Sequence, residues 1–207
     1  MIAASSSRSF ERSAGATAIV VGIGGLLYSI AFVIISRSAP DAGHFLSSLF
    51  LLLGGVLGIQ VMVALYRRLR DIDAGFALVG FMFGFAGALG STVHGAYDLA
   101  NVIHPPATLA ADIPSAVDPR GVLTFGLSGL AVLVIARLMS RGGGFPARLA
   151  LLGYVSGTLL VLIYLGRLIV LDPASPLVLG PAALEGFIVN PVWYVWIGTT
   201  LWRGARS

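Results

Sequence analysis

The sequence predicts an all-α membrane protein, a bundle of six transmembrane helices that forms a single domain over residues 1–207. Composition is the first reason: 57% of the residues are hydrophobic and only 11% are charged, whereas soluble domains carry about 25% charged residues. The second reason is that the apolar residues fall into six runs of about 20 residues, the length that crosses roughly 30 Å of hydrocarbon. These runs fill most of the chain and leave no length for a separate soluble domain.

Short polar joints and prolines set the expected ends of the spans. The His104-Pro105-Pro106 segment should stop the third span at or before His104, because proline removes an amide donor and restricts the preceding residue. Asn190-Pro191 interrupts the last span, where Pro191 should free a carbonyl group near residue 187. We expect the six spans at about 16–36, 45–66, 75–98, 121–139, 147–170 and 182–202.

Glycine is frequent, with 27 residues, and much of it lies inside the spans. Three pairs are spaced four residues apart, which puts both members on one face of a helix and allows a neighbouring backbone to approach closely. We therefore expect tight contacts between helices at these pairs: Gly54 and Gly58, Gly80 and Gly84, Gly153 and Gly157.

The arginines predict the topology. Ten of the thirteen lie at alternate joints between spans, including Arg8 and Arg12 before the first span and Arg203 and Arg206 after the last. The positive-inside rule assigns such joints to the cytoplasm. We expect a multi-pass protein of the bacterial plasma (inner) membrane with both termini in the cytoplasm.

Two missing residue types exclude several classes of function. Without lysine there is no Schiff base to retinal or pyridoxal phosphate, and without cysteine there is no iron–sulfur cluster, thioether-linked haem or thiol relay. A nucleic-acid partner is not expected, because the arginines flank spans instead of forming one continuous face. The expected partners are the lipid bilayer, other membrane-protein subunits or a small apolar molecule.

The residues best suited to chemistry gather on the predicted outer side, which holds all three histidines and six of the nine carboxylates. At the outer end of the third span, His94, Asp98 and Asn101 follow one helix face at i, i+4 and i+7. A carboxylate four residues after an imidazole can orient the ring and raise its basicity. Tyr97 and His104 belong to the same segment.

Three residues of other spans are expected at a similar depth, about one turn inside the outer boundary: His44, Arg167 and Glu185. The first interpretation of this set is structural, with Asp98 or Glu185 paired with Arg167 near the interface, where burying charge costs less. The second is a divalent-metal site in which His94 and Asp98 are joined by His44, His104 or Glu185.

Two further interpretations stay open. Haem or another pigment could be held by His44 and His94 on adjacent antiparallel spans. Alternatively, a small molecule or lipid could bind in an outward-facing polar pocket lined by aromatic and polar side chains. The candidates for lining this pocket are Tyr97, Asn101, Arg167, Asn190 and Trp193, with Phe187, Tyr194 and Trp196 as further aromatic residues of the last span.

Three stretches resemble an uncharacterised bacterial six-helix membrane family, domain of unknown function four-three-eight-six, or a close relative of it. They are Val63-Ala-Leu-Tyr-Arg-Arg-Leu-Arg70, Pro146-Ala-Arg-Leu-Ala-Leu-Leu-Gly153, and Pro191-Val-Trp-Tyr-Val-Trp-Ile-Gly198 followed by Leu201-Trp-Arg-Gly204. The resemblance implies the six-helix plan and a membrane location. It supplies no catalytic residue.

No serine with a recognisable base partner is present, so the sequence favours a protein that is not an enzyme. We expect a non-catalytic integral membrane protein with an outward-facing polar pocket, acting as a binding, sensory or accessory subunit. One alternative is an outer-face membrane enzyme that uses His94 and Asp98 as a metal or acid–base site. Another is a haem- or pigment-binding subunit that uses His44 and His94.

Overall fold

The computed structural model describes residues 2–105, 120–142, 144–170 and 175–204. Every regular element in these ranges is helical, which confirms the all-α prediction. Six helices are long and apolar enough to cross a membrane, so the chain is a multi-pass membrane protein. They are Arg8–Ser38, Pro40–Leu69, Ala74–Ile103, Val122–Arg141, Ala147–Val170 and Pro176–Gly204.

Three of these six helices contain a π-helical segment and are therefore divided into shorter elements. The elements in chain order are α1 (Ile2–Ile30), η1 (Ala31–Ile35), α2 (Ser36–Ser38), α3 (Pro40–Leu69), α4 (Ala74–Ile103), η2 (Val122–Leu127), α5 (Ser128–Arg141), α6 (Ala147–Val170), α7 (Pro176–Leu184), η3 (Glu185–Val189) and α8 (Asn190–Gly204).

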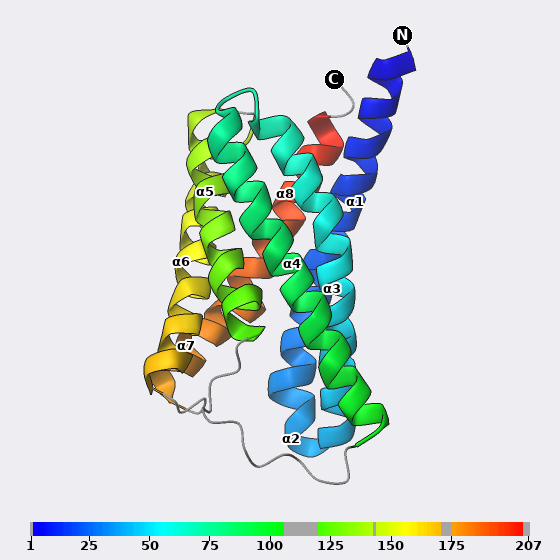
Figure 1. Ribbon diagram of the computed structural model, residues 1–207, viewed down its shortest axis with the longest axis vertical. Helices are drawn as coiled ribbons and strands as arrows, with labels where there is room; N and C mark the ends of the chain where they lie inside the picture. The colour runs from blue at the N-terminus through cyan, green and yellow to red at the C-terminus, as the bar shows by residue number, and fades with distance from the viewer. Residues whose placement is uncertain (1, 106–119, 143, 171–174, 205–207) are drawn as a thin grey trace.

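Both chain termini lie at one end of the bundle, which we call the terminal end; α2 and α7 lie at the opposite, distal end (Figure 1). Neighbours in the sequence pack as antiparallel pairs, α3 with α4 and α5 with α6, while α1 packs against both α3 and α8. At the distal end α7 and α2 lie on opposite sides of the bundle (Figure 1).

Helix ends follow the expected local chemistry at the α3–α4 joint and at the end of α4. Asp73 caps α4 by accepting a hydrogen bond from the amide of Phe76 at 3.1 Å. Arg141, at the end of α5, lies 3.4 Å from the same carboxylate. The Phe76 amide, together with Arg141, lowers the pKa of Asp73 below its ordinary value of 3.8. At the distal end, α4 stops at Ile103, as the prolines after His104 predict.

The last span differs from the prediction, since it begins at Pro176 and not near residue 182. Pro176 occupies the first turn, where a missing amide donor costs nothing. Pro181 lies inside α7, and its ring leaves only the carbonyl of Leu177, in the first turn, without its helical donor. Prolines are tolerated inside membrane helices. Pro181, which the sequence pattern places before the last span, therefore lies within it.

The proline at 191 coincides with a π-helical segment rather than a simple kink. Segment η3 ends at Val189, two residues before Pro191, which is buried in α8. A π turn uses i→i+5 hydrogen bonds and widens the helix, which accommodates a residue that cannot donate. The widened turn begins at Glu185.

Glycines allow the closest contacts between helices. A Cβ atom at Gly129 would lie 2.9 Å from the carbonyl oxygen of Gly157, and one at Gly157 would lie 2.8 Å from that of Gly129. In α3 it is Gly55, and not the predicted Gly54, that faces the backbone of α4; a Cβ atom at Gly54 would meet nothing within 4 Å. The predicted close packing is present, but the sequence spacing selected the wrong neighbour in α3.

The interior is polarised along the bundle axis. The largest fully buried apolar side chains all lie in the terminal half: Val61, Leu65, Leu69, Leu138, Met139, Leu149, Trp193, Ile197 and Leu201. The buried polar side chains lie in the distal half, apart from Ser156 near the middle: Ser29, Ser47, Ser48, Thr124 and Glu185. A tightly packed apolar core therefore closes the terminal half, whereas the distal half buries hydroxyl groups and a carboxylate.

Candidate functional site

At the distal end of α4, His94 and Asp98 form the predicted i, i+4 pair. His94 Nε2 lies 3.4 Å from Asp98 Oδ2. The His94 side chain is 13% exposed and the Asp98 side chain 39% exposed, so the pair lies at the edge of the interior. This part of the sequence-based prediction is confirmed.

The cation that joins this pair is Arg120 rather than Arg167. Arg120 Nη1 lies 3.1 Å from Asp98 Oδ1, and the guanidinium carbon is 4.3 Å from the centre of the Tyr97 ring. Within the described ranges, no ion pair joins Arg167 to Asp98 or Glu185, so the predicted pairing is wrong. Arg120 lies two residues before η2, and the contact ties the start of the fourth span to the end of the third.

Both ring nitrogens of His94 are occupied by protein partners. Nδ1 lies 3.3 Å from Thr124 Oγ1 on η2, and Nε2 faces Asp98. With Nε2–H donating to the carboxylate, the lone pair of Nδ1 is left to accept from the threonine hydroxyl. In this arrangement the ring offers no free lone pair to a metal ion or a haem iron.

The other two histidines lie apart from His94. A Cβ atom at Gly95 would contact Ser48 and Leu52 of α3, so His44 lies about seven residues, or roughly 10 Å, further toward the distal end. His44 and His104 are exposed, and Asn101 is half-buried. The matched height expected for two haem ligands is therefore not present. Among the described residues, no three His, Asp or Glu side chains come together as a metal centre.

Glu185 occupies a different and deeper place. It is 3% exposed and begins η3, nine residues after Pro176, which puts it roughly 13 Å inside the distal end. Ser156 Oγ, on α6, donates a 2.6 Å hydrogen bond to Glu185 Oε1. In the part of the chain that the structure describes, Glu185 Oε2 has no hydrogen-bond partner. The expectation that Glu185 lies one turn inside the boundary is wrong, because the span begins earlier than predicted.

Small and polar residues of α1 and α8 surround this carboxylate. Ser29 packs against Gly186, and the Asn190 oxygen is 3.0 Å from the position that a Cβ atom would take at Gly25. The side chain of Asn190 also faces the carboxyl group of Glu185. These contacts place Glu185 among α1, α6 and α8, on the inner face of the widened π turn.

Two aromatic residues lie toward the terminal end from Glu185. Trp193 is fully buried and fits against Gly153, where a Cβ atom would be 2.9 Å from the indole nitrogen; that nitrogen has no partner among the described residues. The ring of Tyr194 meets Trp193 edge-on, with centroids 5.1 Å apart. Trp193 therefore belongs to the apolar core, while Tyr194 turns toward a cavity.

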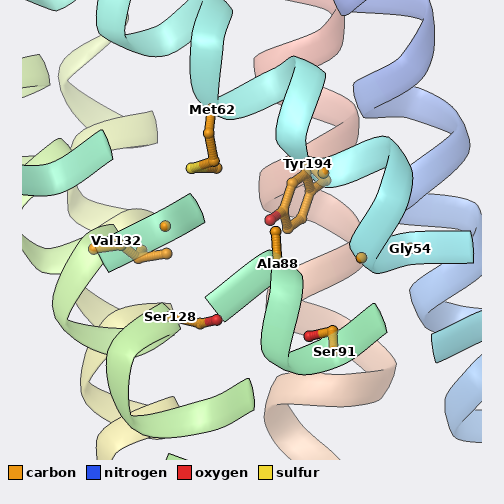
Figure 2. Close-up of a pocket in the computed structure, with 11 residues that line it drawn as sticks. Gly54, Met62, Ala88, Ser91, Ser128, Val132 and Tyr194 are labelled. Atoms are coloured by element: carbon orange, nitrogen blue, oxygen red, sulfur yellow. The ribbon is translucent and has the colours of Figure 1, made fainter. Parts of the chain in front are cut away.

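This cavity has a volume of about 70 Å³ and lies between α3, α4, α5 and α8. Its wall is made of glycines, Ala88, Met62 and the hydroxyl-bearing residues Ser91, Ser128 and Tyr194. Figure 2 shows the tyrosine hydroxyl pointing into this space beside Ala88. The cavity is large enough for several water molecules, since one water needs about 10–15 Å³.

No family model, no curated protein and no solved structure matches this chain. The resemblance to the six-helix family therefore stays a prediction, and function has to be argued from the site itself.

Sequence reasoning missed three participants, and the direction of a fourth, Tyr194. Arg120 and Thr124 follow a proline-rich joint, and nothing in their spacing links them to α4. Ser156 is one of very few polar residues near the middle of a span, and that isolation was the available signal. Tyr194 is an aromatic residue of a type common in the interfacial belts of membrane proteins, so the sequence does not predict that its side chain points inward.

Proposed function

We propose that this protein is a non-catalytic membrane protein that binds a small ligand in a polar pocket open to the outer side of the bilayer. It acts as a binding, sensory or accessory subunit. In this proposal the terminal end faces the cytoplasm of a bacterial cell, because nine of the twelve arginines in the described ranges lie at that end.

The polarised interior carries the proposal. A packed apolar core in the terminal half excludes water from the cytoplasmic side, whereas buried hydroxyl groups and Glu185 lie beyond it in the distal half. A carboxylate at such a depth is costly, on the order of 3 kcal/mol even on insertion scales, and intramembrane ionisable residues mark functional sites by default. A purely structural bundle gains nothing from retaining it.

Glu185 sets the chemistry of the ligand. Its Oε1 is bound to Ser156, so Oε2 is the atom that a ligand would meet. An acceptor in an apolar setting favours a small, mainly apolar molecule that carries one positive charge or one hydrogen-bond donor. The proposed pocket thus combines an apolar wall with a single acidic anchor.

Cysteine accessibility tests the outward opening, and the chain offers a clean background because it has no cysteine. Ser29 and Ala18 are both buried on α1, the first in the distal half and the second in the terminal half. We expect Ser29→Cys to react with a membrane-impermeant methanethiosulfonate reagent added to intact cells, and Ala18→Cys to remain unmodified. Equal protection of both cysteines would reject an outward pocket.

The alternative functions have less support from the geometry. Ligation of haem or a metal by His94 would require breaking its contact with Thr124 or Asp98. The visible absorbance spectrum and the metal content of the purified protein check this directly. A band beyond the aromatic region, or bound metal that a His94→Ala variant loses, would restore these alternatives.

A further inference from the structure

We propose that Glu185 binds and releases a proton within the bundle, and that water in the cavity lined by Tyr194 carries that proton. The inference rests on the role of Glu185 as the acidic anchor of the pocket and names its simplest occupant. It adds a reversible proton site inside the membrane-spanning part of the protein.

The surroundings of Oε2 favour a proton over a metal ion. Ser156 occupies Oε1, and Oε2 stands without a partner among the described residues. A bound metal ion needs several oxygen ligands, and no cluster of three acidic or histidine side chains occurs in the described ranges. A proton needs only the single free oxygen, and it removes the charge that burial disfavours.

Among the described residues, the groups that face Glu185 supply no permanent counter-charge. Segment η3 packs against α1, α6, α7 and α8. The nearest titratable residues on α1 and α8 are Tyr28 and Tyr194, and α7 has no titratable residue. On α6, Tyr154 and Tyr164 are uncharged, and the two charged residues, Arg148 and Arg167, lie eight and eleven residues from Ser156, roughly 12 and 16 Å along the helix. The carboxylate therefore depends on an exchangeable ion for neutralisation.

Tyr194 lies in the cavity wall, on the helix that continues from Glu185. Tyr194 follows Glu185 by nine residues, roughly 13 Å along the helix, and its side chain leans back toward the N-terminus, so water has to bridge the remaining gap to the carboxyl group. The Tyr194 hydroxyl lies in the cavity wall with Ser91 and Ser128. A hydroxyl can accept one proton and donate another, which suits it to pass a proton between water and the carboxyl group.

Isotope labelling can observe Glu185 without altering the site, because the chain contains only two glutamates, Glu11 and Glu185. Glu11 lies at the terminal end, where it contacts Arg68. A Glu11→Gln variant made by cell-free synthesis, with glutamate labelled at the side-chain carboxyl carbon and its conversion to other amino acids blocked, leaves Glu185 as the only labelled residue. Reconstituted in liposomes, it is titrated by solid-state carbon-13 NMR from about pH 4 to pH 9.

The expected result is one carboxyl resonance that moves from the position of the neutral acid to that of the carboxylate as pH rises, at constant sodium. A resonance that stays at one position throughout would overturn the proposal, as would one that moves with sodium concentration and not with pH. Tyr194→Phe keeps the ring and should slow the exchange of the acid proton into deuterated water; unchanged exchange would reject the cavity route. Cysteine accessibility at Ser29 does not depend on these outcomes, so failure of the proton site and failure of the outward pocket remain distinguishable.

Discussion

The hydroxyl of Ser156 donates a 2.6 Å hydrogen bond to Oε1 of Glu185, joining α6 to the π segment between α7 and α8. It is a contact between two fully or almost fully buried side chains, 29 residues apart in the sequence. The contact holds Glu185 in place through Oε1. It leaves the second carboxylate oxygen, Oε2, available, because Oε2 has no hydrogen-bond partner among the described residues.

Ser156→Ala should lower the free energy of unfolding by about 1–3 kcal/mol, because it leaves a buried carboxylate oxygen without its donor. Thermal unfolding in detergent, followed by tryptophan fluorescence, measures the loss. In a Glu185→Leu background the same substitution should cost almost nothing, since no acceptor remains. Ser140→Ala, at an exposed serine of α5, is the matched control. An equal cost in both backgrounds would contradict the contact.

Arg120→Gln should lower stability by about 0.2–1 kcal/mol, the range for partly exposed ion pairs, and raising the salt concentration should reduce the effect. Arg167→Gln serves as the comparison, because Arg167 pairs with neither Asp98 nor Glu185. Thermal unfolding at low and high salt distinguishes the two variants. A larger loss of stability for Arg167→Gln would contradict this account and would favour Arg167 as the cation that pairs with Asp98.

Asp73 should make the terminal end sensitive to acid. Since its pKa is lowered in the folded protein, the carboxylate stabilises the fold above its ordinary value of 3.8, and this contribution disappears as pH falls through the lowered pKa. The melting temperature of Asp73→Ala should therefore lie a few degrees below that of the wild type at neutral pH, and the gap should close in acid. Asp71→Ala, at an exposed carboxylate, should show no such gap.

Gly129→Ala should destabilise the bundle by about 1–3 kcal/mol, because the added methyl group would overlap the carbonyl oxygen of Gly157. Gly24→Ala is the control, since a Cβ atom there would meet nothing within 4 Å; it should leave stability unchanged or increase it by up to about 1 kcal/mol. Detergent melting curves of both variants decide the point. Equal tolerance of the two substitutions would mean that α5 and α6 do not cross closely at Gly129.

The sequence predicted the number of spans and the His94–Asp98 pair because both depend on local periodicity. A run of about 20 apolar residues and a spacing of four residues have meaning without knowledge of the neighbours. The end of α4 was predictable for the same reason, since prolines act on the residues next to them.

The depth of Glu185 was not predictable by such rules. It depends on whether Pro181 ends a helix or lies inside one, and the second outcome is tolerated in membrane proteins because neighbouring helices, hydroxyl side chains and local π turns satisfy the freed backbone groups. The partner of Asp98 was equally hidden, because Arg120 reaches it across a joint whose path no local pattern specifies. The π segments depend on how neighbouring helices pack, so the periodicity of the sequence does not predict them.

The central claim, an outward pocket with Glu185 as its acidic anchor, is tested most directly by charge selectivity at Ser29→Cys. The rates of modification by a quaternary ammonium and a sulfonate methanethiosulfonate reagent are compared in intact cells under mildly alkaline conditions, with either Glu185 or Glu185→Gln. We expect the cationic reagent to react faster, and its advantage to vanish in the Gln variant while the cysteine stays accessible. Equal rates for both reagents in the presence of Glu185, or an advantage that survives its replacement, would contradict the account.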